Sequence, residues 1–123
     1  MIGYVTLGTN NMDRAAGFYD ALLGTLGASR FMENERVIAW AVSPDTPALG
    51  IIKPFDGNPA TVGNGAMVAL AVDSREKVDA MHKQALELGA QDEGAPGPRG
   101  DGSFYAGYFR DLDGNKLNFF CIR

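Results

Sequence analysis

The chain has 123 residues, of which 46% are hydrophobic and 21% charged, and its formal net charge at pH 7 is -4. This length is typical of one domain that buries its own core. The negative balance leaves no basic stripe that could neutralise phosphates, which argues against nucleic-acid binding. No apolar run approaches membrane-spanning length, and no signal-peptide pattern opens the sequence, so we expect no membrane partner. The single cysteine, Cys121, excludes an internal disulfide and favours a reducing, cytoplasmic location.

The first half of the chain predicts a strand, a helix and three further strands. Ile2 to Gly8 is β-like, and Asn10 or Asn11 offers an N-cap for a helix with one apolar face that ends at Gly24 or Gly27. Three strand candidates follow, at about Ser29–Glu33, Arg36–Val42 and Ala48–Lys53. The first two could pair through a tight turn at Asn34-Glu35. Residues 54–64, with two prolines, are expected to connect two halves.

The second half predicts the same order of elements. A β-run covers 65–72, and Asp73-Ser-Arg-Glu76 has the form of a capping box that starts a helix ending at Gly89. A short strand is expected near Gln91–Glu93. Residues 94–102 are expected to form a loop, because Pro and Gly remove regular hydrogen bonding.

A hairpin closes the chain. Tyr105 to Arg110 alternates as a strand does, Asp111 to Asn115 predicts a turn in which Gly114 has a positive φ, and Lys116 to Ile122 alternates again. One face of this last strand carries Leu117, Phe119 and Cys121, and the other carries Lys116, Asn118 and Phe120. An apolar face opposite a face with an Asn is typical of a strand that lines a cavity.

The two halves repeat one another at a spacing of 63 residues, as in Val5 and Val68 (68 − 5 = 63) or Arg14 and Lys77. Each half therefore predicts one βαβββ unit. The expected boundaries are about 1–53 for the first module, 54–64 for a linker and 65–123 for the second module, all within a single domain. Neither unit could bury its sheet alone, whereas two units side by side could curve around one shared cleft.

This organisation resembles the vicinal oxygen chelate superfamily, which includes glyoxalase I, bleomycin-resistance proteins and extradiol dioxygenases. The resemblance rests on Val5-Thr-Leu-Gly8 leading to Phe18-Tyr-Asp20, on Gly63-Asn-Gly65, and on Arg110-Asp-Leu-Asp-Gly-Asn-Lys-Leu117, where Leu112 replaces the usual Pro. It covers essentially the whole chain. It implies an α+β fold in which two tandem βαβββ modules form a curved, partly open sheet around one cavity.

The resemblance also implies where a metal would be held in members that have one. The expected ligand positions fall on Tyr4 in the first strand, near Ile52 in the fourth, on Met67 in the fifth and on Asn118 in the eighth. A hard divalent ion prefers imidazole and carboxylate donors, and these residues supply neither. We therefore expect no metal and no other cofactor.

Other candidate groups have simpler explanations. His82 is the only histidine, which rules out any Ser-His-Asp or Cys-His arrangement, and packing of a helix or a surface position is expected for it. Cys121 is expected to be a buried, inert thiol. Arg99 lies in the Pro/Gly segment, where it could contact an anion or simply be a solvated loop cation. The Asp111–Asn115 segment lacks the acidic ladder of a calcium loop.

An apolar pocket with a few polar groups is the resulting prediction. The expected cavity residues are Tyr4, Thr6, Trp40, Ile52, Met67, Tyr108, Asn118 and Phe120. For Trp40 and Tyr108 this depends on strand register, which one sequence does not fix.

Three functions stay open on these grounds. The first is metal-independent binding of a small organic molecule, with no catalytic residue. The second is a glyoxalase-like lyase or isomerase with a degenerate or relocated active site, in which Tyr4 or Lys116 moves a proton. The third is a module for self-association, since small members of this superfamily commonly form homodimers.

Overall fold

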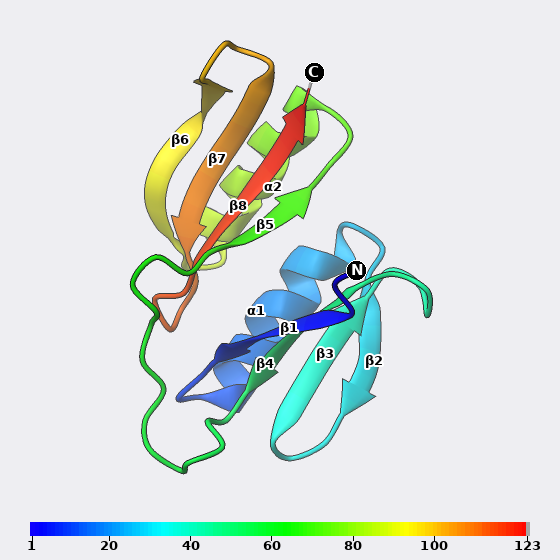
Figure 1. Ribbon diagram of the computed structural model, residues 1–123, viewed down its shortest axis with the longest axis vertical. Helices are drawn as coiled ribbons and strands as arrows, with labels where there is room; N and C mark the ends of the chain where they lie inside the picture. The colour runs from blue at the N-terminus through cyan, green and yellow to red at the C-terminus, as the bar shows by residue number, and fades with distance from the viewer. Residues whose placement is uncertain (123) are drawn as a thin grey trace. The chain divides into compact units, whose positions relative to one another are not determined.

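The computed structural model describes residues 1–122, which form two helices and eight strands arranged as two four-stranded sheets (Figure 1). The chain divides into two compact units, Met1–Val62 and a second that starts at Gly63. We call them module 1 and module 2. The fold is α+β, with each module built as βαβββ, which confirms the prediction.

Module 1 consists of β1 (Tyr4–Gly8), α1 (Met12–Gly24), β2 (Ser29–Glu33), β3 (Val37–Ala41) and β4 (Ala48–Ile52). Its strand order is β1-β4-β3-β2, with β1 parallel to β4 and the other neighbours antiparallel. The side chain of Asn11 caps α1 by accepting a hydrogen bond from the Arg14 amide at 3.0 Å. Leu22 and Tyr19 of α1 are buried, as are Ile51 and Trp40 of the sheet, so the core lies between helix and sheet.

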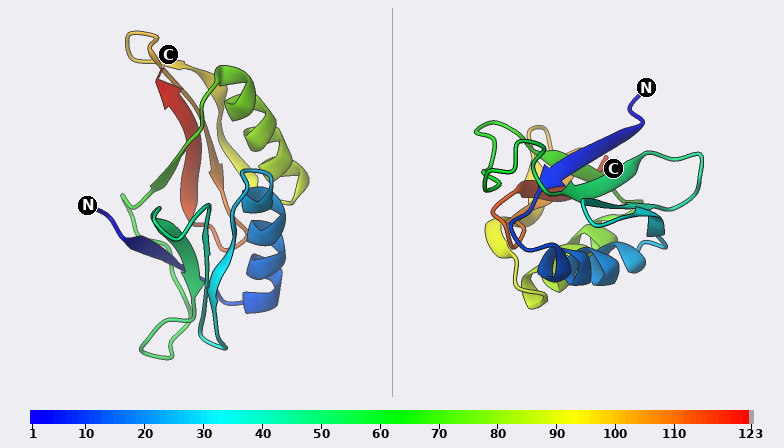
Figure 2. Two further views of the ribbon diagram at one scale, coloured as in Figure 1. Left: turned by 90° about the vertical axis from the view of Figure 1, so that its right-hand side faces the viewer. Right: turned by 90° about the horizontal axis from the view of Figure 1, so that it is seen from below.

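Module 2 consists of β5 (Val68–Ala71), α2 (Arg75–Glu87), β6 (Gln91–Arg99), β7 (Phe104–Arg110) and β8 (Lys116–Ile122). Its strand order is β5-β8-β7-β6. Helix α2 lies along one face of this sheet (Figure 2). The residues that fill the space between them are all buried: Val78, Met81, Ala85, Phe109, Leu117 and Phe119.

The internal duplication is present in the topology as well as in the sequence. The two strand orders correspond term by term, with β5, β8, β7 and β6 in the places of β1, β4, β3 and β2. The helices begin 63 residues apart (75 − 12 = 63) and end 63 residues apart (87 − 24 = 63). Their caps keep the same spacing, because Ser74 caps α2 as Asn11 caps α1.

The cap of α2 corrects the predicted capping box. Ser74 is the N-cap and accepts from the Lys77 amide at 3.1 Å, whereas Asp73 lies one residue before it. Asp73 instead forms an ion pair with Lys77 at 3.6 Å. Ser and Asp are almost equally good N-caps, so two adjacent candidates gave no basis for choosing between them.

The predicted loop at 94–102 is wrong for residues 94–99, because β6 extends from Gln91 to Arg99, whereas residues 100–102 form a turn. Pro96 and Pro98 are tolerated because β6 is an edge strand with only one hydrogen-bonded neighbour, β7. The pairing shifts register on both sides of Gly94. These irregularities let a segment rich in Pro and Gly follow β7 without a regular ladder.

The closing hairpin has the predicted form. Strands β7 and β8 pair from Phe104 with Ile122 to Arg110 with Lys116. In the turn, Gly114 has a φ of 88°, a conformation that favours glycine. The carboxylate of Asp111 accepts hydrogen bonds from the Asp113 and Asn115 amides, both at 2.9 Å. The turn is therefore a hydrogen-bonded structural element.

Candidate functional site

Each sheet has one face packed on its helix and a second face turned away from it, which we call the open face. In module 2 the assignment follows from Gly107, because a Cβ placed there would lie 3.0 Å from the ring of His82 in α2. Gly107 is opposite Phe119, so these residues point to the helix. Side chains alternate along a strand. Tyr108, Asn118 and Phe120 therefore lie on the open face.

Asn118 is the unusual residue of this face. It is 1% exposed, and neither its Oδ1 nor its Nδ2 has a hydrogen-bond partner among the described residues. Buried polar groups in native proteins are almost always paired, and leaving one unpaired costs about 1–3 kcal/mol. An unpaired buried amide in a folded sheet calls for an explanation.

The neighbours of Asn118 are aromatic and cationic. Tyr108 lies directly opposite on β7, and Ala69 lies opposite on β5. The Lys116 ammonium is 5.4 Å from the centre of the Tyr108 ring, and the Arg99 guanidinium is 5.5 Å from it. The open face of module 2 thus combines an amide, a ring and two positive charges.

Two further predicted cavity residues belong to module 2. Phe120 is half-buried and stacks on Phe104 with 5.4 Å between ring centres. Met67 lies immediately before β5 and is 42% exposed. By alternation Met67 lies on the side of Ala69, which is that of Asn118.

In module 1, Tyr4, Thr6 and Ile52 share the open face. Thr6 is opposite Gly50, and a Cβ on Gly50 would lie 3.5 Å from the Thr6 methyl carbon. Tyr4 is 72% exposed, and Ile52 is half-buried. The enclosure of one cavity by both open faces stays a prediction.

Trp40 corrects the predicted cavity. Its indole Nε1 donates to the Asp20 carboxylate of α1 at 2.8 Å, and its ring lies 5.6 Å from that of Tyr19. It is 2% exposed and belongs to the helix-facing side of β3. Trp40 therefore packs the core of module 1 and does not share the face of Tyr4 and Thr6.

The duplication identifies a position that sequence reasoning missed. Thr6 and Ala69 are 63 residues apart (69 − 6 = 63), and they are opposite Gly50 and Asn118 respectively. Gly50, rather than the neighbouring Ile52, is therefore the module 1 counterpart of Asn118. Ala39 of β3, which is opposite Gly50, takes the place of Tyr108. Strand pairing reveals this, whereas the sequence of β4 alone offers no polar residue to notice.

The donor chemistry at these positions does not fit a divalent metal. A phenol, a glycine without a side chain, a thioether and a neutral amide occupy Tyr4, Gly50, Met67 and Asn118. Zinc, nickel and manganese sites in proteins rely on imidazole, thiolate or carboxylate donors. Among residues 1–122 no group of three or more His, Cys, Asp and Glu side chains gathers as a metal would require.

His82 has a packing role, and its partner was not predicted from the sequence. It is 4% exposed, and its Nε2 lies 3.1 Å from an Asp92 carboxylate oxygen and 3.0 Å from the Tyr108 carbonyl. With two acceptors at this distance, Nε2 carries the proton and donates. Hydrogen bonds from the Gly94 amide and from His82 lower the pKa of Asp92. His82 thus joins α2 to the irregular part of β6.

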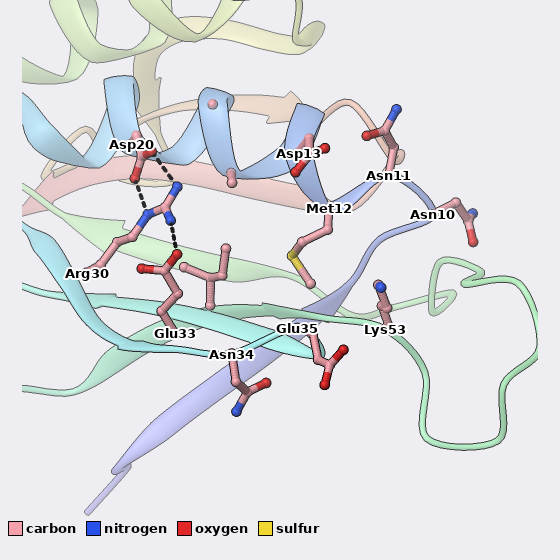
Figure 3. Close-up of a pocket in the computed structure, with 13 residues that line it drawn as sticks. Asn10, Asn11, Met12, Asp13, Asp20, Arg30, Glu33, Asn34, Glu35 and Lys53 are labelled. Carbon is pink, nitrogen blue, oxygen red and sulfur yellow. Dashed lines mark hydrogen bonds and ion pairs between the residues drawn. The ribbon is translucent and has the colours of Figure 1, made fainter.

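A separate open hollow of about 840 Å³ lies on module 1 between the start of α1 and the β2–β3 hairpin (Figure 3). Arg30 extends between Asp20 and Glu33, with ion-pair distances of 2.8 and 2.7 Å. The hydrogen bond from Arg30 is the main reason that the pKa of Asp20 is lowered. The charges of Arg30, Asp20 and Glu33 are thus paired with one another, and they fasten α1 to the hairpin.

A sequence model of the Glyoxalase/Bleomycin resistance protein/Dioxygenase superfamily matches residues 1–119. The chain belongs to this superfamily. A glyoxalase/bleomycin resistance protein from Albidiferax ferrireducens T118 has a similar structure, with 38% identity, a TM-score of 0.90, and coverage of 100% of this chain and 99% of that one. A search of curated proteins found no match.

Two more distant structures share the fold of this superfamily member. A glyoxalase-related enzyme from Fulvimarina pelagi is 19% identical, with a TM-score of 0.78 and coverage of 98% and 87%. A lactoylglutathione lyase from Agrobacterium tumefaciens is 18% identical, with a TM-score of 0.73 and coverage of 98% and 92%. At this identity the likeness concerns the fold alone. In the part of the chain that the structure describes, no helix has the length and apolar character needed to cross a membrane.

Proposed function

We propose that this protein binds a small organic molecule without the help of a metal, at the open face that carries Asn118. The observation behind the proposal is the buried amide of Asn118, whose donor and acceptor atoms have no partner within the described residues. A ligand with polar groups of its own would supply the missing hydrogen bonds. The aromatic ring of Tyr108 beside it would add apolar contact.

The residues at the expected ligand positions support metal independence. None of Tyr4, Gly50, Met67 and Asn118 offers a carboxylate or an imidazole. Binding alone, as a protein that sequesters a toxic compound would do, requires no catalytic group. The match to a superfamily that includes bleomycin resistance proteins is consistent with such a role.

Two measurements on the purified protein test this proposal. Elemental analysis after expression should find less than stoichiometric Ni, Zn, Mn and Fe. A thermal-shift screen of small aromatic and amide compounds should find ligands that raise the Tm of the wild-type protein and not that of Asn118→Leu. A stoichiometric metal that is required for activity would contradict the proposal, and so would ligands indifferent to Asn118.

A glyoxalase-like lyase or isomerase is the alternative. It would use Tyr4, which is 72% exposed, or Lys116 to move a proton. Phenols and lysine side chains ordinarily carry their protons at pH 7 and so are poor general bases, which makes this the less favoured proposal. Assays with hemithioacetals, catechols and epimerase substrates test it. Turnover that is lost in Tyr4→Phe would establish it in place of simple binding.

Assembly and location belong to the same proposal. We expect a homodimer, as the superfamily resemblance implies, with edge strands and the exposed side chains of Ile2 and Tyr4 available for contact. We expect a cytoplasmic location, because the one cysteine is buried and unpaired. Localisation of a tagged protein by cell fractionation would test the second expectation.

A further inference from the structure

The unpaired amide of Asn118 restricts the chemistry of its partner. An Asn side chain presents an acceptor, Oδ1, and a donor, Nδ2, side by side in one plane. Both are buried and unpaired in module 2. A ligand satisfies both with a donor and an acceptor side by side on one edge, which is the pattern of an amide, lactam or cyclic imide edge, and of the adenine edge that Asn reads in DNA.

The ring next to Asn118 favours a flat ligand. Tyr108 is opposite Asn118 on the same face, where the Cβ atoms of such cross-strand pairs lie about 5 Å apart. Lys116 and Arg99 lie over this ring, so a ligand held by the amide would contact the ring beside these two cations. On the other side, β5 places the small side chain of Ala69 opposite Asn118.

The charges around Tyr108 favour a negative ligand. Lys116 and Arg99 approach the ring at 5.4 and 5.5 Å, and neither has a carboxylate partner in the described part of the chain. Arg99 donates only to the Ala95 and Pro98 carbonyls. By contrast, Arg110 on the same face pairs with Glu93 at 3.0 Å. Two cations without a carboxylate partner among the described residues thus lie at the Tyr108 ring, in a chain whose net charge is -4.

We propose that the ligand of this face is a planar heterocycle with adjacent donor and acceptor atoms, of the amide or cyclic-imide type, that also carries a carboxylate or similar anion. This inference rests on the proposed binding function and specifies its ligand. Asn118 would pair with the donor–acceptor edge, Tyr108 would contact the heterocycle, and Lys116 with Arg99 would hold the anion beside the Tyr108 ring. A vicinal diol or diketone that chelates a metal is a different class of ligand.

Four probes separate these features. Orotate has a cyclic imide and a carboxylate, 1,3-dimethylorotate keeps the charge but loses the N–H donors, uracil keeps the imide but lacks the charge, and benzoate has only a charged flat ring. Isothermal titration of the purified full-length protein at low and moderate salt measures each affinity. We expect orotate to bind at least tenfold more tightly than each of the other three.

Variants assign the contacts. Asn118→Leu should weaken the binding of orotate at least tenfold, because both hydrogen bonds are lost. It should leave the affinity for benzoate almost unchanged. Lys116→Gln should weaken the binding of orotate about threefold to tenfold and reduce the salt dependence of that binding. The affinity for uracil should not change. Lys83→Gln, on the exposed side of α2, is the matched control and should change neither.

The outcomes distinguish this inference from the proposed function. If benzoate and dimethylorotate bind as tightly as orotate, the ligand class is wrong although binding itself stands. If none of the four probes and no compound of the wider thermal-shift screen binds, both proposals fail. Orotate affinity that is unchanged in Asn118→Leu overturns the inference too, since the amide would then be satisfied by a buried water molecule.

Discussion

Asn118 and Asn115 are two buried amides, three residues apart, whose situations differ. Asn115 Nδ2 donates to the Asp111 carboxylate at 3.0 Å, whereas Asn118 has no partner in residues 1–122. A buried hydrogen bond stabilises a fold modestly, while a buried group without one destabilises it. The same chemical change at these two positions should therefore have opposite effects on stability.

We expect Asn118→Leu to raise the free energy of unfolding by about 1–3 kcal/mol, because the unpaired amide is replaced by an apolar group of similar size. Asn115→Leu should lower it by a similar amount, since Asp111 loses its partner. Urea denaturation of the unliganded proteins measures both. A loss of stability in Asn118→Leu would indicate that its amide is satisfied by an ordered water.

At this scale the sequence predicted the strand face of Asn118 and Phe120 but not that of Trp40. Alternation in β8 places polar and apolar side chains on different faces, so the face of Asn118 could be inferred. Ile38, Ala39, Trp40 and Ala41 are all apolar and all buried, so β3 contains no alternation from which to assign a face. Only the hydrogen bond from Trp40 to Asp20 settles the matter.

The position of α1 depends on Asp20, which receives hydrogen bonds from Arg30 of β2 and Trp40 of β3. Its pKa in the folded protein is lowered, chiefly by Arg30, so its contribution to stability is present above the unfolded pKa of about 3.9 and is lost as pH falls through the folded value. We expect Asp20→Asn to flatten the loss of stability below about pH 4. Urea titrations at several pH values, with Asp45→Asn from an exposed turn as control, measure it; an unchanged slope would contradict it.

Two glycines in regular elements predict opposite responses to alanine. Gly17 is exposed within α1, and nothing lies within 4 Å of an added Cβ, so Gly17→Ala should stabilise by about 0.5–1 kcal/mol. At Gly107 in β7 an added Cβ would lie 3.0 Å from both His82 and Pro96, so Gly107→Ala should destabilise by about 1–3 kcal/mol. Chemical denaturation of the pair checks this. Equal changes in the free energy of unfolding for the two variants would show that local packing does not determine these changes.

Sequence reasoning succeeded for nearly all elements, but of β6 it predicted only the segment near Gln91–Glu93 and missed the extension to Arg99. Helices α1 and α2 have apolar periodicity and capping residues, which are local features. Strand β6 depends on pairing with β7, a long-range interaction that the prolines and glycines of 94–99 conceal. The Pro/Gly part of β6 is a strand because it pairs with β7, and not because its own residues favour a strand.

At the scale of the molecule, the duplication made the fold predictable, because two matching halves restrict each other. The 63-residue spacing joins helices, caps and first strands, and both sheets have the same order. The sequence repeat did not reveal which residue of module 1 corresponds to Asn118, because that residue, Gly50, carries no side chain to compare with Asn118. Function is thus less predictable than fold, since few residues decide it.

The assembled protein should be a homodimer under the proposed function. Light scattering coupled to gel filtration is then expected to give a mass about twice that of the 13.1 kDa chain. Adding Ni²⁺ or Zn²⁺ should leave this mass and the Tm unchanged, because a ligand that does not bind the native state cannot stabilise it. A measured mass of one chain would contradict the proposed dimer, and a metal-dependent rise in Tm would contradict metal independence.

The irregular, proline-bearing strand β6 affects how the protein behaves when crowded with copies of itself. An exposed sheet edge is a template for fibre growth, and a strand that lacks N–H donors at Pro96 and Pro98 is a poor template. Strand β2, the corresponding edge of module 1, has no proline and exposes Phe31 and Met32. Aggregation on heating should therefore begin at the β2 edge, whereas the prolines of β6 should keep another chain from pairing with that edge.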